Sequence, residues 1–110
     1  MITTSAEVDV SEEMMRNYFS HLVNSFFKIL PIREGGGKSL PVYLRSLQVE
    51  ILGCKKLILE LDYDPRFITL SSILEYLIDN PECEVKVVKR EVFRAIDICN
   101  KLKTQYTEAV

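Results

Sequence analysis

Residues 40–61, LPVYLRSLQVEILGCKKLILEL, carry the pattern that decides the fold. Apolar side chains recur in this stretch at alternating intervals of four and three residues, which corresponds to three heptads of core positions on one side of an α-helix. The recurring residues are Leu40, Leu44, Leu47, Ile51, Cys54, Ile58 and Leu61. We therefore expect a continuous amphipathic helix over 40–61, with Pro41 in its first turn, where proline is tolerated.

Gly53 lies inside this expected helix, where glycine costs about 1 kcal/mol relative to alanine. Two interpretations are open. Gly53 occupies a neutral surface position, or it allows another helix to approach closely beside Cys54.

The preceding segment has the same periodicity, with Met15, Phe19, Leu22, Phe26 and Ile29 spaced four, three, four and three residues apart. Ser11 is a good N-cap, and Glu12 and Glu13 suit the positive end of a helix dipole. Val10 is placed to pack against Met15 as a hydrophobic staple. We expect a helix over 11–30 that Pro31 ends, preceded by flexible residues 1–9.

Residues 31–39, PIREGGGKS, are expected to form a glycine-rich loop. The string resembles the end of a phosphate-binding loop, G-x-x-x-x-G-K-[ST], but Ile32 stands where the first glycine should be. An amphipathic helix also precedes the string, where the motif requires a buried strand. The most that we expect is a weak anion site at Gly36, Gly37, Lys38 and Ser39, and we expect Gly36→Ser to be nearly neutral.

Two further helices complete the pattern. Asp64 and Pro65 form a strong helix start, and apolar spacing continues over 65–79 until Asn80-Pro81. Residues 83–87, CEVKV, alternate like a strand, but the period of a helix fits 22 residues, which favours a helix over 83–106. The apolar positions that set this period are Val85, Val88, Val92, Ala95, Cys99, Leu102 and Tyr106.

Four amphipathic helices with short connections predict an all-α fold, an elongated up-down four-helix bundle formed by residues 1–110 as a single domain. The helices over 40–61 and 83–106 are long for a chain of 110 residues. We therefore expect part of their apolar seams to stay uncovered within one chain and to meet a second copy in a homodimer.

The charge balance gives little support for a nucleic-acid partner, because 14 Lys and Arg stand against 16 Asp and Glu. The last helix nevertheless carries basic residues that could contact phosphates, and they define the alternative function of a small nucleic-acid-binding accessory protein. They are Lys86, Lys89, Arg90, Arg94 and Lys101. The other interpretation is an ordinary solvated helix surface, since acidic residues are interspersed among them.

No arrangement typical of catalysis is visible. His21 is the single histidine, and the adjacent Ser20 points away from it on a helix. Three cysteines without a CxxC motif predict neither a disulfide framework nor a metal site, and they favour a reducing, cytoplasmic setting. Apolar runs are too short to span a membrane. The sequence predicts a non-enzymatic interaction or adaptor module without a cofactor, whose partner is a protein or a second copy of the chain.

Overall fold

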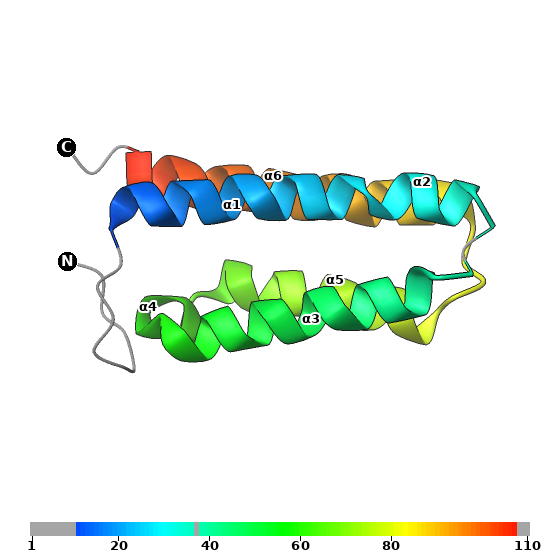
Figure 1. Ribbon diagram of the computed structural model, residues 1–110, viewed down its shortest axis with the longest axis horizontal. Coiled ribbons are helices and arrows are strands. Elements are labelled where there is room, and N and C mark those ends of the chain that lie inside the picture. Colours follow the sequence, from blue (N-terminus) through cyan, green and yellow to red (C-terminus); the bar gives the residue numbers. More distant parts are fainter. Residues whose placement is uncertain (1–10, 37, 108–110) are drawn as a thin grey trace.

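The computed structural model describes residues 11–36 and 38–107, which fold into helices joined by short turns (Figure 1). The helices are α1 (Glu12–Phe27), α2 (Ile29–Glu34), α3 (Leu40–Leu57), α4 (Leu59–Asp62), α5 (Pro65–Asp79) and α6 (Val85–Thr107). The expected all-α bundle is confirmed. The molecule is elongated, with principal extents of 43, 25 and 20 Å.

The start of α1 is set by Ser11, as the sequence predicts. The Met14 amide donates to the Ser11 hydroxyl at 3.1 Å, and Glu12 and Glu13 occupy the first turn. The expected contact between Val10 and Met15 and the flexibility of residues 1–9 lie outside the described residues.

The expectation that Pro31 ends the first helix is wrong. Pro31 has no N–H to offer to the Phe27 carbonyl, so the helical ladder is interrupted and α1 ends at Phe27. Lys28 nevertheless keeps right-handed helical angles (φ −64°, ψ −18°), and α2 continues to Glu34. Pro31 lies in the first turn of α2, where a missing donor costs little. The first four residues of the expected loop over 31–39 are therefore helical.

The expected continuous helix over 40–61 is also interrupted, because Ile58 adopts extended angles (φ −98°, ψ 102°) between α3 and α4. The short α4 then turns the chain toward α5. Ile58 and Leu61 are 2% and 1% exposed, so both remain in the core despite the break. The periodicity identified the buried residues correctly and did not reveal the change in backbone direction.

The last two helices agree closely with the sequence. α5 covers the expected residues 65–79, and the Asp64 carboxylate caps it by accepting from the Arg66 amide at 2.9 Å. α6 begins at Val85, two residues later than expected, and ends at Thr107. Residues 85–87 are helical, which resolves the ambiguity of the 83–87 segment in favour of the helix.

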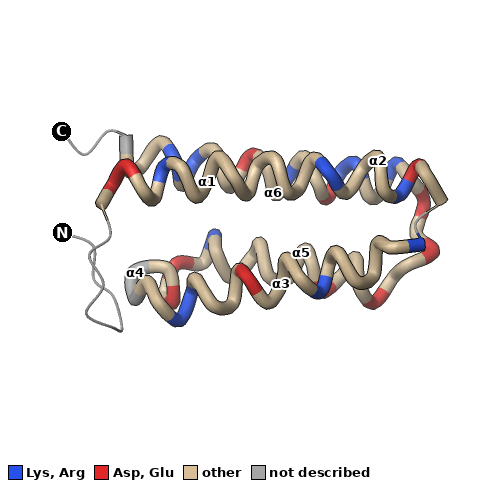
Figure 2. Tube along the Cα trace, viewed as in Figure 1, with Lys and Arg blue, Asp and Glu red and all other residues tan. Residues whose placement is uncertain are grey.

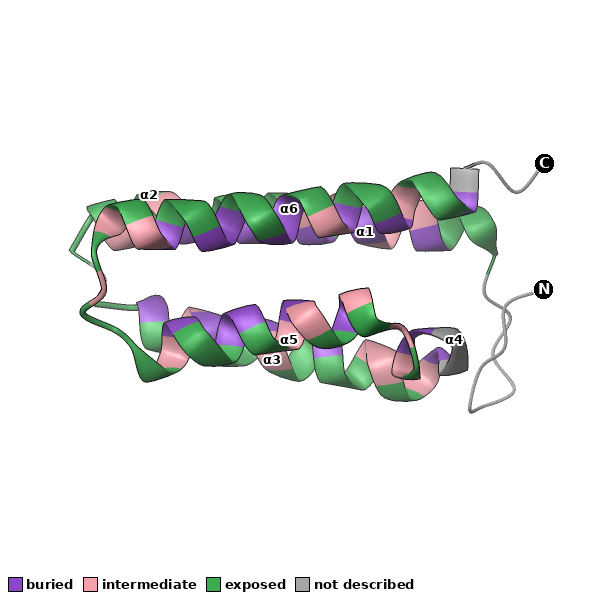
Figure 3. Ribbon diagram, turned by 180° about the vertical axis from the view of Figure 1, so that it is seen from behind, coloured by how far each residue is buried: buried purple, intermediate pink, exposed green. Residues whose placement is uncertain are grey.

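The helices form two layers (Figure 1). α1 and α2 pack along α6, and α3 packs along α5, while contacts of α5 with α6 and of α2 with α3 join the layers. Buried residues lie on the sides where the layers face each other (Figure 3). Most seam positions are buried within the chain: Leu44, Ile51, Val92 and Leu102 are at most 1% exposed, while Cys54 and Val85 are half-buried. Little of the seam is therefore left uncovered, and the expected homodimer stays a prediction.

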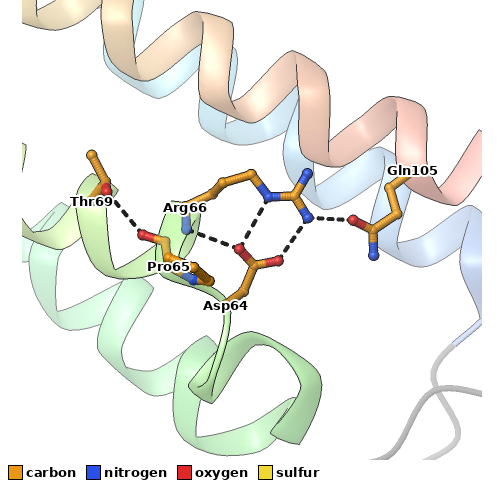
Figure 4. A network of polar contacts seen from close by, with 5 residues as sticks. All are labelled: Asp64, Pro65, Arg66, Thr69 and Gln105. Atoms are coloured by element: carbon orange, nitrogen blue, oxygen red, sulfur yellow. Dashed lines mark hydrogen bonds and ion pairs between the residues drawn. The ribbon is translucent and has the colours of Figure 1, made fainter.

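A polar network connects the start of α5 to the end of α6 by hydrogen bonds (Figure 4). The Arg66 guanidinium donates to the Asp64 carboxylate through Nε at 3.1 Å and Nη2 at 2.8 Å, and Nη2 also donates to the Gln105 amide oxygen. At the same end of the bundle, Arg16 donates to the Tyr106 carbonyl at 2.9 Å, which ties α1 to α6.

Candidate interaction surface

The side of α3 that faces solvent carries three exposed apolar residues. Its buried side carries the seam leucines, yet Val42 and Val49 on the opposite side are 70% and 69% exposed, and Leu52 is 40% exposed. Val42 and Val49 are seven residues apart, so they lie on the same side of the helix, two turns from each other. Valine is a weaker helix former than alanine, so neither helix propensity nor core packing explains these two residues.

Small and charged side chains complete this surface. Arg45 and Ser46 line a shallow, open depression together with Val42 and Val49. Gly53 continues the line, and apart from its two neighbours and the backbone of α3, no atom of the described residues lies within 4 Å of where its Cβ would be. Of the two interpretations of Gly53, the structure supports the surface position within the described chain, and no other described helix approaches it closely. We call this surface the α3 stripe; it comprises Val42, Arg45, Ser46, Val49, Leu52 and Gly53.

A second exposed apolar feature lies on the α1–α6 layer. The rings of Phe27 and Phe93 meet edge to face at a centroid distance of 5.9 Å, although the two residues are 42% and 51% exposed. Each ring already covers part of the other. The α3 stripe is the longer of the two surfaces and is therefore the better candidate.

The structure brings partners to His21 that the sequence did not reveal. His21 Nε2 lies 3.0 Å from Glu50 Oε1 on α3 and 3.5 Å from Ser25 Oγ, one helical turn further along α1. A serine–histidine–carboxylate relay needs the serine on one ring nitrogen and the carboxylate on the other. Here both groups approach the same nitrogen, and Ser25 is only 7% exposed. The cluster joins α1 to α3 and lacks the geometry of a nucleophile with its base.

The cysteines and Tyr18 are packing groups. Burial raises the pKa of the Cys54 thiol to about 11 and that of the Cys99 thiol to about 12. Burial also raises the pKa of the Tyr18 hydroxyl well above its usual range. These groups are protonated at neutral pH, so neither thiol is a nucleophile in the folded chain. All three cysteines are free, and the described residues contain no cluster of three metal-ligating side chains.

Each of the five basic residues proposed to contact nucleic acid has a carboxylate within 4.0 Å. Lys86 lies near Glu84, Lys89 near Glu34, and Lys101 near Asp97 at 3.0 Å. Arg90 and Arg94 both approach Glu91, at 3.3 and 3.2 Å. Basic and acidic residues are interspersed along both layers (Figure 2). The positive charge of α6 is thus largely compensated where it arises.

The weak anion site expected at Gly36, Gly37, Lys38 and Ser39 stays a prediction, since only Gly36 of these residues lines the neighbouring cleft. Gly36 has φ 110° and lines a cleft of about 290 Å³ with Arg33, Leu40, Pro41 and Glu82, among others. Lys38 and Ser39 are exposed and do not line this cleft, and the Ser39 hydroxyl does not cap α3. Gly37 lies outside the described residues. The cleft is lined by one guanidinium, from Arg33, and one carboxylate, from Glu82, so their formal charges cancel.

The α3 stripe has a signal of its own in the sequence, separate from the leucine seam. Val42 and Val49 repeat at seven residues, out of phase with the leucine seam, and that second repeat is visible in the sequence.

Among the described residues, none of the helices has the length and apolar character needed to cross a bilayer. No family, no curated protein and no solved structure matches this chain.

Proposed function

We propose that this chain is a non-enzymatic interaction module that binds a helical protein segment along the α3 stripe. The observation that carries the proposal is the exposure of Val42 and Val49, 70% and 69%, on the side of α3 opposite a closed core. Apolar anchors at positions i and i+7 of a helix are the pattern that a partner helix recognises.

The length of the α3 stripe determines how large an interface it can form with a partner. α3 has 18 residues, and the stripe over residues 42–53 is about 18 Å long, enough for about three turns of contact with one partner helix. One helix against one helix buries an area at the low end of specific interfaces, which is typical of transient complexes. The flanking groups Arg45 and Glu50 are exposed and can fix the orientation of the partner.

We propose further that the protein acts in a reducing compartment such as the cytoplasm, since all three of its cysteines are free thiols. The alternative function, nucleic-acid binding by α6, has weaker support because every candidate basic residue lies beside a carboxylate.

Site-specific photocrosslinking in cells tests the proposal. A photoreactive amino acid at Val49 is expected to give discrete protein adducts, and the same group at the exposed Thr104 of α6 serves as the matched control. Adducts at Val49 should disappear when Val42→Asp is added, because a charge then enters the apolar contact. Equal adducts at both positions, or none at Val49, would contradict the proposed function.

A further inference from the structure

The two edges of the α3 stripe differ in charge. At 100° per residue, Val42, Ser46, Val49 and Gly53 fall within about 60° of the helix circumference. Arg45 and Leu52 lie along one edge of this band, and Glu50 and Leu57 lie along the other. In heptad terms, the central band supplies the a and d positions, Arg45 and Leu52 are at g, and Glu50 and Leu57 are at e.

We propose that the helix bound by the α3 stripe is α3 of a second copy of this chain, in parallel orientation and in register. This inference rests on the proposed function and names its partner. In a parallel helix pair, each g position faces the e position five residues further along the other helix. Arg45 therefore faces Glu50 of the partner subunit, and Leu52 faces Leu57 of the partner subunit. The twofold axis repeats both contacts.

The charges distinguish parallel from antiparallel pairing. In an antiparallel pair, like edges meet, so the Arg45 edge would face its own copy and the Glu50 edge would face its own copy. Both arrangements bury the two valines, but only the parallel one pairs opposite charges. The stripe is thus complementary to itself in one orientation.

The local geometry leaves Glu50 able to make this contact. Its Oε1 interacts with His21 at 3.0 Å, and a carboxylate has a second oxygen that can accept from an arginine. The side chain of Glu50 is 41% exposed. Ser46 and Gly53, at the a positions, let the two backbones approach, and the valines at the d positions fill the space between them. Lys56 falls at the next d position and faces its own copy, so we expect a weak, reversible dimer.

Charge exchange tests the pairing. Sedimentation equilibrium of the full chain at concentrations up to about 1 mM should show a reversible monomer–dimer equilibrium. Arg45→Glu alone and Glu50→Arg alone should each weaken association about tenfold, because each places like charges at two contacts. An equimolar mixture of the two variants should restore association as a heterodimer. Lys101→Glu, an equal change of charge on the other layer, should leave the equilibrium unchanged.

Disulfide formation tests the orientation. Position 49 is a d position and faces its own copy only in a parallel, in-register pair. Val49→Cys, combined with Cys54→Ser and Cys83→Ser, should therefore form a covalent dimer rapidly on mild oxidation. Thr104→Cys in the same background should remain monomeric. Slow crosslinking at position 49, equal to that at position 104, would overturn the inference.

Failure of this inference is distinguishable from failure of the proposed function. A wild-type chain that stays monomeric at all concentrations, or a dimer that does not respond to either charge variant, would overturn the parallel α3 pair. If position 49 then still gave photoadducts with a different protein in cells, the stripe would remain an interaction surface with another partner. If it gave none, both proposals would fail.

Discussion

The Asp64 carboxylate holds Arg66 in two ways at once. It accepts from the Arg66 backbone amide at 2.9 Å as the N-cap of α5, and it accepts from the guanidinium of the same residue at 2.8 and 3.1 Å. Arg66 in turn reaches Gln105 on α6. A single side chain thus starts one helix and positions the group that ties it to another.

Asp64→Ala is expected to lower the free energy of unfolding by about 1 kcal/mol at pH 7, through the loss of the cap. The hydrogen bonds from Arg66 hold the pKa of the Asp64 carboxyl below its usual range. The contribution of the Asp64 carboxylate to the free energy of unfolding is therefore complete above the pKa of about 4 that it has in the unfolded chain. This contribution declines as pH falls through the lower pKa of the folded chain. Urea denaturation of the wild type and of Asp64→Ala at pH 7 and pH 2 measures the difference in unfolding free energy at each pH. Asp79→Ala, at the opposite end of α5, is the control; an equal effect of both substitutions would contradict the cap assignment.

Leu47→Asp and Val49→Asp separate the buried and exposed sides of α3. Leu47 is 5% exposed, so an aspartate there would be a buried, unpaired charge, and we expect the chain to unfold. Val49 is 69% exposed, and Val49→Asp should change the free energy of unfolding by less than about 0.5 kcal/mol. Circular dichroism melting curves, recorded on dilute protein, compare the two. A folded Leu47 variant would show that the core is assigned to the wrong side of α3.

Much of the fold could be predicted because burial follows periodicity. Asp64 and Pro65 fixed the start of α5 through local chemistry, and the leucine seam named the core side of α3. The breaks at Lys28 and Ile58 could not be predicted as readily, because they depend on neighbouring helices as well as on local preference. Pro31 interrupts one hydrogen bond, yet packing of α2 against α6 keeps the chain helical beyond it.

Gly36 and Gly53 are expected to respond in opposite ways to alanine. Gly36 has φ 110°, which residues with a Cβ rarely adopt, so Gly36→Ala should cost about 1–3 kcal/mol. This corrects the sequence-based expectation that Gly36→Ser is nearly neutral. Gly53 is helical with open space around its Cβ position, so Gly53→Ala should stabilise the monomer by up to about 1 kcal/mol. Denaturation midpoints in dilute solution measure both changes, and shifts of the same sign would contradict the backbone geometry.

The candidate surface was less predictable than the core. An exposed valine is common on any protein, and only burial of the leucine seam within the chain shows that Val42 and Val49 belong to a separate surface. Similarly, Ser25 lies four residues after His21 and could be anticipated, whereas Glu50 reaches the histidine from another helix. Contacts between distant segments such as this one are invisible to periodicity.

The buried thiols predict a loss of stability at alkaline pH. Burial raises the pKa of Cys99 from 9.0 to about 12, so the unfolded chain ionises first as pH rises. The stabilisation that the neutral, buried Cys99 thiol provides is complete below the pKa of this thiol in the unfolded chain. It is lost progressively between about pH 9 and pH 12. Cys99→Ala should therefore show a shallower decline in unfolding free energy over this range than the wild type. Val92→Ala is the control, because it creates a core cavity without removing a titrating group and should lower stability by the same amount at every pH. Parallel pH profiles for the wild type and Cys99→Ala would mean that the Cys99 thiol does not contribute to the alkaline loss.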